Sequence, residues 1–436
     1  MLWLLFIVAA WLLLLMLIGG YDLQIAGNRL QVMSRVVSAT LLAGLIYLVI
    51  FFIFGRQALL AEHISPTWLN LFDLSLPPRL VPALLIALGL PLLIAWRFTY
   101  IRLFSNPALH RRAVIVGVGE AGSMLVHATQ QVTVAYEYAG FIDHDPTLHG
   151  QTVAGIKVLG SYDVLDRLVR TRSVDEVIVT VTNQGEDRFF TSLVLCHEQG
   201  VKIRSVSNVY EEVLGQVPVE HLGPEWFVDT FNNNFPTVYR LFKRLLDIVA
   251  GMAGMAGLAL IFPFIALAIY LDSPGPIFYR QERHGQYGRR FHVLKFRSMI
   301  PNAEKVGLEK LGLDKWTEKN DPRITRVGRL IRKARIDELP QVWNILKGNM
   351  SVVGPRPEVS RMVERLEREV PYYRLRFSVK PGLTGWAQVR YRYGATIEDQ
   401  LAKLRYDLYY IKHQSLVLDL LIIIRTLRVV FSFRGV

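Results

Sequence analysis

Cysteine is almost absent from this sequence: Cys196 is the only one among 436 residues. A single cysteine excludes an intrachain disulfide framework and a zinc cluster built from cysteines. Acidic residues are also scarce relative to basic ones, with 37 Asp and Glu against 50 Lys and Arg, so the formal net charge is +13. We therefore expect an anionic partner: phospholipid, a phosphate-bearing substrate or nucleic acid.

Long apolar runs are abundant near the start of the chain, at residues 2–19, 37–55 and 80–96. Each approaches the 20 or so apolar residues that cross a bilayer, and we predict three transmembrane helices. The first lacks a preceding basic segment and a following cleavage site, which favours an anchor over a cleaved signal peptide. Arg29 and Arg35 place the first connection in the cytoplasm. This topology leaves the chain's start outside, and we expect that one earlier span is missing.

Residues 111–235 alternate between buried strands and polar helical segments, which predicts a Rossmann-like α/β domain. In "VIVGVGEAGS", Gly117, Gly119 and Gly122 follow a strand and open a helix, as in dinucleotide-phosphate sites. Asp143 ends the next strand, where a ribose-binding acid belongs. Such glycines also allow close packing of helix on strand, so cofactor binding and a purely structural loop both stay open.

A membrane-tethered nucleotide-sugar oxidoreductase or epimerase is the alternative function that this glycine motif raises. Such an enzyme would need a Tyr-x-x-x-Lys pair with a serine upstream. Tyr239 and Lys243 have that spacing, but they open an apolar helix and no serine lies between Ser207 and Ser273. We interpret Lys243 as the flank of a membrane helix.

Residues 245–271, within the predicted membrane helix 243–271, form a further apolar run, which Pro263 interrupts. Proline removes a helix hydrogen bond and kinks the helix. Both flanks are basic, with Lys243 and Arg244 before the run and Arg280, Arg283, Arg289 and Arg290 after it. A simple span carries positive charge mainly on one side, so we predict a re-entrant helix, with a Pro-kinked span as the alternative. Close packing of one face is expected from the spacing of Gly251, Gly254 and Gly257.

Residues 272–436 are polar and rich in arginine, and we predict a mainly α-helical α/β catalytic domain. Its last apolar segment is interrupted by Asp419, Arg425 and Arg428, which indicates an interfacial helix rather than a span. The predicted fold class is therefore a membrane protein with N-terminal transmembrane helices, a Rossmann-like middle domain, a re-entrant helix and this catalytic domain.

Two adjacent acids, Asp337 and Glu338, stand in "RIDELPQ". Proline is tolerated only in the first turn of a helix, so Pro340 predicts a helix that begins near Asp337, runs to about Lys347 and stops at Gly348. One interpretation is that Asp337 has no role beyond capping this helix. A helix N-terminus also attracts anions, and many cations are expected nearby: Lys295, Arg297, Arg326, Arg329, Lys333 and Arg356. Acids among so many bases indicate a phosphate substrate and a divalent metal, with one acid forming a covalent bond to the substrate.

The stretches "KRLLDIV", "SPGPIFYRQERHG", "LKFRSM", "NDPRITRVGRLIRK", "IDELPQVWNILKGNMSVVGPRPE" and "KPGLTGWAQV" follow one another between residues 243 and 430. In this order they resemble the bacterial sugar transferases, the polyprenyl-phosphate hexose-1-phosphate transferases or monotopic phosphoglycosyl transferases, in their large form. "VRYRYGATIED" and "LRYDLYYIKHQSLVLDLLI" look like the exopolysaccharide branch associated with exosortase systems. One departure is Phe262, which stands before Pro263 where many members have serine.

The resemblance implies a reaction and roles for individual residues. Asp337 matches the nucleophile and Glu338 its partner, and Mg²⁺ is the usual metal, which both acids would hold. Arg356 matches a nucleotide-side contact, while Lys295, Arg332 and Arg392 match basic residues of the same site. Arg297 is added from its position in "LKFRSM". The implied reaction joins a UDP-sugar and polyprenyl (undecaprenyl) phosphate, giving polyprenyl-diphosphate-sugar and UMP, at the start of exopolysaccharide assembly.

The expected partners are therefore a UDP-sugar, polyprenyl phosphate and membrane lipid, at the cytoplasmic face of the bacterial inner membrane. Nucleic acid is not expected, because the basic residues alternate with prolines and acids rather than with an aromatic stacking platform. The hexose, the ligand of the Rossmann-like domain and the oligomeric state, a homodimer included, stay open at this point.

Overall fold

The computed structural model describes residues 111–130, 136–180, 187–232, 237–303, 321–391, 394 and 396–431, with scattered positions before residue 100. The chain divides into two compact units, Met1–Val209 and Tyr210–Val436. The three predicted N-terminal spans lie outside the described residues, apart from those scattered positions. Each unit is described by itself.

The first unit contains a Rossmann-like sheet, as the alternation of strands and helices predicted. Its strand order is β3-β4-β2-β1-β5-β6, and all neighbours pair in parallel except β3 with β4. The apolar side chains of β1 are fully buried from Ala113 to Ile115, as expected for a sheet covered on both faces. The elements are β1 (Arg111–Val116), α6 (Glu120–Gln130), β2 (Tyr136–Ile142), β3 (Thr152–Val153), β4 (Ile156–Gly160), α7 (Tyr162–Arg170), β5 (Glu176–Val179), α8 (Asp187–Glu198) and β6 (Lys202–Ser205).

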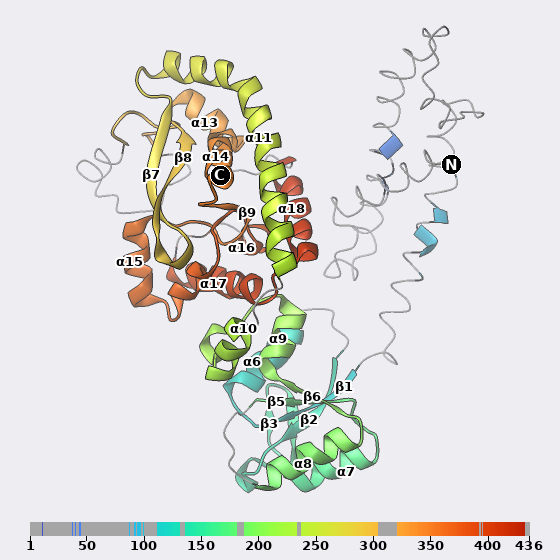
Figure 1. Cartoon of the computed structure of the whole chain (residues 1–436). Helices are drawn as coiled ribbons and strands as arrows, with labels where there is room; N and C mark the ends of the chain where they lie inside the picture. Colours follow the sequence, from blue (N-terminus) through green and yellow to red (C-terminus); the bar gives the residue numbers. More distant parts are fainter. Residues whose placement is uncertain are drawn as a thin grey trace. The chain divides into compact units, whose positions relative to one another are not determined.

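The second unit is mainly helical and contains two small two-stranded sheets, β7 with β8 and β9 with β10 (Figure 1). Hairpin β7–β8 is antiparallel over seven residue pairs, whereas β9 and β10 pair in parallel. The elements are α10 (Pro224–Asn232), α11 (Thr237–Asp272), β7 (Phe278–His284), β8 (Arg290–Phe296), α13 (Arg326–Lys333), η9 (Ile336–Gln341), α14 (Val342–Lys347), β9 (Ser351–Val353), α15 (Ser360–Glu369), η10 (Tyr373–Ser378), β10 (Gly382–Thr384), α16 (Trp386–Arg390), α17 (Ile397–Lys412) and α18 (Leu416–Phe431).

The segment from Tyr210 to Asn232 packs inside the second unit, although the sequence analysis extended the α/β domain to residue 235. Its buried Val217, Val219 and Trp226 share one hydrophobic cluster with residues of α15 and α17. Trp226 also donates a hydrogen bond to Glu211, at 2.9 Å. Composition alone did not separate this segment from the α/β domain. The apolar face of an amphipathic helix shows that the helix packs on a core, but it does not identify which of two neighbouring cores.

Helix α11 is 36 residues long and runs through Pro263. Within the described residues, it is the one helix long and apolar enough to cross a membrane. A straight helix of this length would measure about 54 Å, yet both ends contact other helices of the same unit. Arg244 donates to the carbonyls of Ile345 and Leu346 at the end of α14. At the other end, the Asp272 carboxylate accepts the N–H of Val327 on α13. Figure 1 shows the sharp bend in α11 that makes this arrangement feasible.

The spacing of three glycines in α11 predicted close packing of one helix face. The structure shows such packing at two of the three. A Cβ on Gly251 would lie 2.8 Å from the Leu346 side chain, and one on Gly254 would lie 2.7 Å from Val342. Around Gly257 there is open space. The first two glycines therefore bring the backbone of α11 against α14.

Lys243, interpreted from the sequence as the flank of a membrane helix, lies near the start of α11 and is bound by a buried acid. Its ammonium group donates to Asp419 at 3.0 Å, to the Tyr410 hydroxyl and to the carbonyl of Val353. The Asp419 side chain is fully buried, and Tyr239 and Tyr410 also donate to it. The acid that interrupts the apolar run of α18 is thus the partner that joins α18 to α11.

We predict that Lys243→Met lowers the free energy of unfolding by about 3 kcal/mol or more, because it leaves Asp419 charged, buried and without its cation. Chemical denaturation of the purified protein in detergent measures this loss. Arg240→Met, at an exposed position on the same helix, is the matched control and should change the unfolding free energy little. The double variant Lys243→Met/Asp419→Leu should recover most of the loss; a double variant less stable than the single one would contradict this account.

Candidate active site

Asp337 and Glu338 lie in the short 3-10 helix η9, between α13 and α14. The prediction of a single helix from about Asp337 to Lys347 is wrong in its first half, because α14 begins only at Val342. Its end is confirmed, since Gly348 has a left-handed φ of 84° after the last helical residue. The cap position before the acids is occupied by Arg335, with φ 56° and no side-chain cap bond. Asp337 is therefore not the helix cap.

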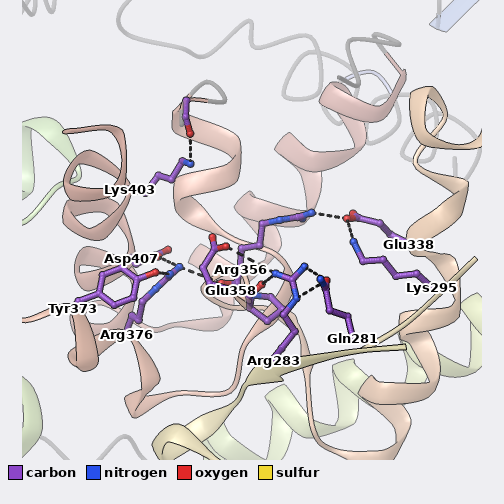
Figure 2. A network of polar contacts seen from close by, with 12 residues as sticks. Gln281, Arg283, Lys295, Glu338, Arg356, Glu358, Tyr373, Arg376, Lys403 and Asp407 are labelled. Atoms are coloured by element: carbon purple, nitrogen blue, oxygen red, sulfur yellow. Dashed lines mark hydrogen bonds and ion pairs between the residues drawn. The ribbon is translucent and has the colours of Figure 1, made fainter. Parts of the chain in front are cut away.

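One oxygen of Glu338 binds two cations. Its Oε1 atom accepts the Lys295 ammonium group at 3.1 Å and the Arg356 guanidinium at 2.6 Å (Figure 2). Lys295 comes from β8, and Arg356 comes from the turn after β9. Burial by itself would raise the pKa of Glu338, but the two cations outweigh it and hold the pKa well below its ordinary value. Glu338 is thus a permanently ionised, fixed carboxylate.

Asp337 differs from its neighbour in its contacts and in the net shift of its pKa, although burial raises the pKa of both acids and the same two cations lower it. Its carboxylate makes no hydrogen bond or ion pair with any residue that the structure describes. Burial raises the pKa of Asp337 to about 6, and the negative charge of Glu338 adds to the rise. Even so, the group is mostly ionised at pH 7. An ionised carboxylate without a partner, beside one that is saturated with cations, has the properties of a nucleophile.

The other cations that the sequence predicted near the acids lie on α13, lie away from the acids, or fall outside the described residues. The α13 charge that most lowers the pKa of Asp337 is that of Arg332, not those of the predicted Arg326, Arg329 or Lys333. Arg297 lies elsewhere: it is buried under the turn after α11 and donates to the carbonyl of Ser273. Arg392 lies outside the described residues.

Two arginines that the sequence analysis did not assign also belong to this region. Arg283, at the end of β7, donates to the carbonyl of Pro357 at 2.8 Å, and Arg376, in η10, donates to the carbonyl of Arg356 at 3.1 Å. Arg283 lies within the stretch "SPGPIFYRQERHG", which was a usable signal, whereas no pattern in the sequence distinguished Arg376 from its exposed neighbour Arg374.

Comparisons with known proteins identify the family of the chain. Residues 238–433 match the family model described as "Bacterial sugar transferase". A UDP-N-acetylgalactosamine-undecaprenyl-phosphate N-acetylgalactosaminephosphotransferase of Aeromonas hydrophila is 35% identical over 309 residues, which cover 70% of this chain and 68% of that protein. The chain belongs to the bacterial sugar transferase family. It is an enzyme of this type, and the resemblance stated from the motifs is confirmed.

Two further relatives of this sugar transferase cover different shares of it. A UDP-glucose:undecaprenyl-phosphate glucose-1-phosphate transferase of Xanthomonas campestris pv. campestris is 35% identical over 62% of this chain and 56% of that protein. An "Exopolysaccharide production protein PSS" of Rhizobium leguminosarum bv. phaseoli is 42% identical over 42% of this chain and 92% of that protein. Residues 16–207 match a family model described as "CoA-binding domain". The narrower likeness to the exosortase-associated branch stays a prediction.

The donor set of the sugar transferase fits a magnesium ion that is shared with substrate. Among the residues described, no three His, Cys, Asp or Glu side chains gather into a metal site. Two adjacent carboxylates are present, and Mg²⁺ in phosphate-transferring sites is commonly held by one or two carboxylates with water and phosphate oxygens. Asp337 and Glu338 would therefore hold the predicted ion.

In the Rossmann-like sheet of the sugar transferase, the glycine motif is partly structural. Gly117 has a φ of 98°, which favours glycine, and a Cβ on Gly122 would lie 2.9 Å from the Phe141 ring. Around Gly119 there is open space. Asp143 is buried and accepts the N–H of Val118 at 2.7 Å, so it stabilises the loop. A cofactor bound by these residues stays a prediction.

We predict that Asp337→Asn stabilises the metal-free protein at pH 7.5 by on the order of 2 kcal/mol. The folded protein carries the full cost of an ionised Asp337 above pH about 6, and this cost disappears as pH falls toward the ordinary value of 3.8. The gain should therefore shrink between pH 6 and 4. Chemical denaturation in EDTA across this range measures it.

Glu338→Gln is the matched control with the opposite sign. Because the pKa of Glu338 is lowered in the folded protein, its charge contributes stability above its unfolded pKa, and the variant should lose stability at pH 7.5. A small loss of stability in Asp337→Asn at every pH would instead indicate a capping role for Asp337.

Proposed function

We propose that the chain transfers a hexose-1-phosphate from a UDP-sugar to polyprenyl (undecaprenyl) phosphate and releases UMP, through a phosphosugar ester of Asp337. The observation that carries the proposal is the contrast within the acid pair. Glu338 is bound by Lys295 and Arg356, while the Asp337 carboxylate has no partner among the described residues. The undecaprenyl-phosphate transferases among the relatives support the substrate class.

In the first half of the reaction, a carboxylate oxygen of Asp337 attacks the sugar-bearing phosphorus of the UDP-sugar. The bond from this phosphorus to the bridging oxygen breaks, and UMP leaves with the electron pair. Arg356 and Lys295 offset the negative charge that develops on the phosphates. Bound Mg²⁺ would supply further charge neutralisation at the same phosphates.

In the second half, an oxygen of polyprenyl phosphate attacks the phosphorus held on Asp337. The acyl-phosphate bond breaks, the carboxylate of Asp337 is restored, and polyprenyl-diphosphate-sugar is the product. Glu338 keeps its two cations in both halves, so it acts by holding charge rather than by exchanging a proton. The oxidoreductase alternative is not favoured, because Lys243, which it would need, is bound to Asp419.

The hexose is left unassigned, because relatives that share 33–35% identity with this chain are named for N-acetylgalactosamine, glucose and galactose. A role in exopolysaccharide assembly is part of the proposal, and the name of the Rhizobium relative supports it. We place the catalytic unit at the cytoplasmic face of the bacterial inner membrane. Support comes from α11, whose two ends contact one unit while Leu260 and Phe264 are about three-quarters exposed.

Incubation of the purified protein with UDP-glucose, UDP-galactose or UDP-N-acetylgalactosamine and Mg²⁺ should release UMP once per active site before any lipid is added. Intact-protein mass spectrometry should then detect one hexose-phosphate on the chain, and peptide mapping should locate it on Asp337. Asp337→Asn removes the nucleophile and should give neither product. Glu338→Gln should lower turnover strongly but allow slow adduct formation.

A strict need for both substrates before UMP appears, with no adduct at any time, would contradict the two-step route. It would leave Asp337 as a metal ligand in a direct displacement. Replacing Asp337 with Glu is a useful second control, because a longer carboxylate keeps the charge but shifts the attacking oxygen.

Topology is tested by cysteine labelling in a Cys196→Ser background. Cysteines placed at the exposed positions Arg112 and Tyr287 should react only with reagent that reaches the cytoplasm. This outcome is expected if α11 enters and leaves on one side. Labelling of the two positions from opposite sides would establish a full span and exclude the re-entrant helix.

A further inference from the structure

The turn that carries Arg356 accepts hydrogen bonds through three consecutive carbonyl groups. Pro355 and Pro357 flank Arg356, and proline has no N–H to donate. Three consecutive carbonyls of this turn each accept a hydrogen bond instead. That of Pro355 accepts the N–H of Gly382 at 2.9 Å, that of Arg356 accepts Arg376 at 3.1 Å, and that of Pro357 accepts Arg283 at 2.8 Å. Two of the three donors are arginine side chains from other elements.

Arg376 is the more deeply buried of these arginines and is itself held in place. It is 5% exposed and donates to the Asp407 carboxylate at 2.8 Å and to the Tyr373 hydroxyl. Asp407, on α17, is 1% exposed. The nitrogen that binds Asp407 is also the one that donates to the carbonyl of Arg356. Figure 2 shows this chain of contacts from α17, through η10, to the turn.

Burying two such charges costs free energy that their attraction only partly returns, so the pair is a poor means of stabilising a fold. What a buried pair does supply is a fixed geometry. The guanidinium of Arg376 has one orientation that satisfies Asp407, Tyr373 and the carbonyl of Arg356 together. That orientation fixes the backbone of the turn on which Arg356 stands.

The placement of this backbone matters because the Arg356 side chain is long and 37% exposed. A long, half-solvated side chain has many rotamers, and holding it in one of them costs conformational entropy. Its guanidinium reaches Glu338 at 2.6 Å. A small shift of the turn would change that distance and the direction of the remaining N–H groups.

We infer that Arg376, held by Asp407, is a positioning residue that acts through Arg356: it fixes the Pro355–Pro357 turn so that the Arg356 guanidinium lies between Glu338 and the diphosphate of the nucleotide donor. The inference rests on the proposed function, since it names the donor as the group that Arg356 binds. Arg376 itself is buried behind the turn, where Tyr373, Asp407 and the carbonyl of Arg356 bind its terminal nitrogens. It therefore affects donor binding only when Arg356 is present.

A double-mutant cycle tests this dependence. The four proteins are the wild type, Arg376→Lys, Arg356→Ala and the double variant, and the readouts are KM and kcat for the UDP-sugar that releases most UMP. Arg376→Lys keeps the charge but loses the fork that binds Asp407 and the carbonyl together. With Arg356 present, it should raise KM by about tenfold or more, as expected for loss of a charged hydrogen bond.

With Arg356 replaced by alanine, Arg376→Lys should raise KM less than about twofold, because the residue through which it acts is gone. Arg374→Lys is the matched control: it lies two residues away in the same η10 element, is 73% exposed and pairs only with Glu367 among the described contacts. It should leave KM and kcat unchanged. Equal factors for Arg376→Lys in both backgrounds would overturn the inference and assign Arg376 to general stability.

Two further measurements keep the result decisive. Asp407→Asn and Tyr373→Phe loosen Arg376 from the other side, and either should reproduce part of the KM increase if Arg376→Lys does not fold. Calorimetry of UDP binding to the same four proteins repeats the double-mutant cycle without turnover, and it compares Kd values instead of KM values. A wild type that binds UDP but releases no UMP would refute the proposed reaction alone, while additive Kd changes would refute the role of Arg376 alone.

Discussion

The candidate active site depends on one carboxylate oxygen, Oε1 of Glu338, which binds Lys295 and Arg356 at once. Two adjacent carboxylates in a buried site would normally share a proton, because neither tolerates a second charge nearby. The two cations remove this difficulty for Glu338 and leave the protonation equilibrium to Asp337 alone. They also bring together β8, η9 and the turn after β9, which are separated by 43 and 18 residues in the chain. The electrostatic asymmetry and the local fold therefore have the same origin.

Buried ion pairs recur where hydrophobic packing cannot define a position. Helix α11 is apolar on most of its surface, and in lipid an apolar helix gains nothing from choosing one apolar neighbour over another. Lys243 and Asp419 give α11 and α18 a single register, and Gly251 and Gly254 set how closely α11 approaches α14. Arg376 and Asp407 play the same part for the turn of Arg356, whose two flanking prolines have no N–H to donate. In each case, burying the charged pair costs desolvation free energy, and the pair holds its two segments in one defined geometry.

Elements defined by local rules were predictable from the sequence. Alternating strands and helices identified the Rossmann-like sheet, Gly348 marked a helix end, and the motif resemblance named the acids and the cations Lys295, Arg332 and Arg356. Features that depend on contacts between distant segments were not predictable. No spacing rule pairs Lys243 with Asp419, separates buried Arg376 from exposed Arg374, or assigns residues 210–232 to the second core. The 3-10 geometry at Asp337 was also missed, because Pro340 limits where a helix starts without specifying its hydrogen-bond pattern.

A covalent intermediate would also explain how one set of cations serves two very different substrates. In the proposed reaction, UDP-sugar would arrive from water and polyprenyl phosphate from the bilayer, and a direct transfer would need both anions in the site together. If Asp337 holds the hexose-phosphate, UMP would depart before the lipid phosphate binds, and the charge of Arg356 would become available to that incoming phosphate. The cations would then never face the donor diphosphate and the lipid phosphate together, which lowers the repulsion between bound phosphates. On this view the asymmetry between Asp337 and Glu338 separates the part of the site that is covalently altered from the part that stays constant through both halves of the reaction.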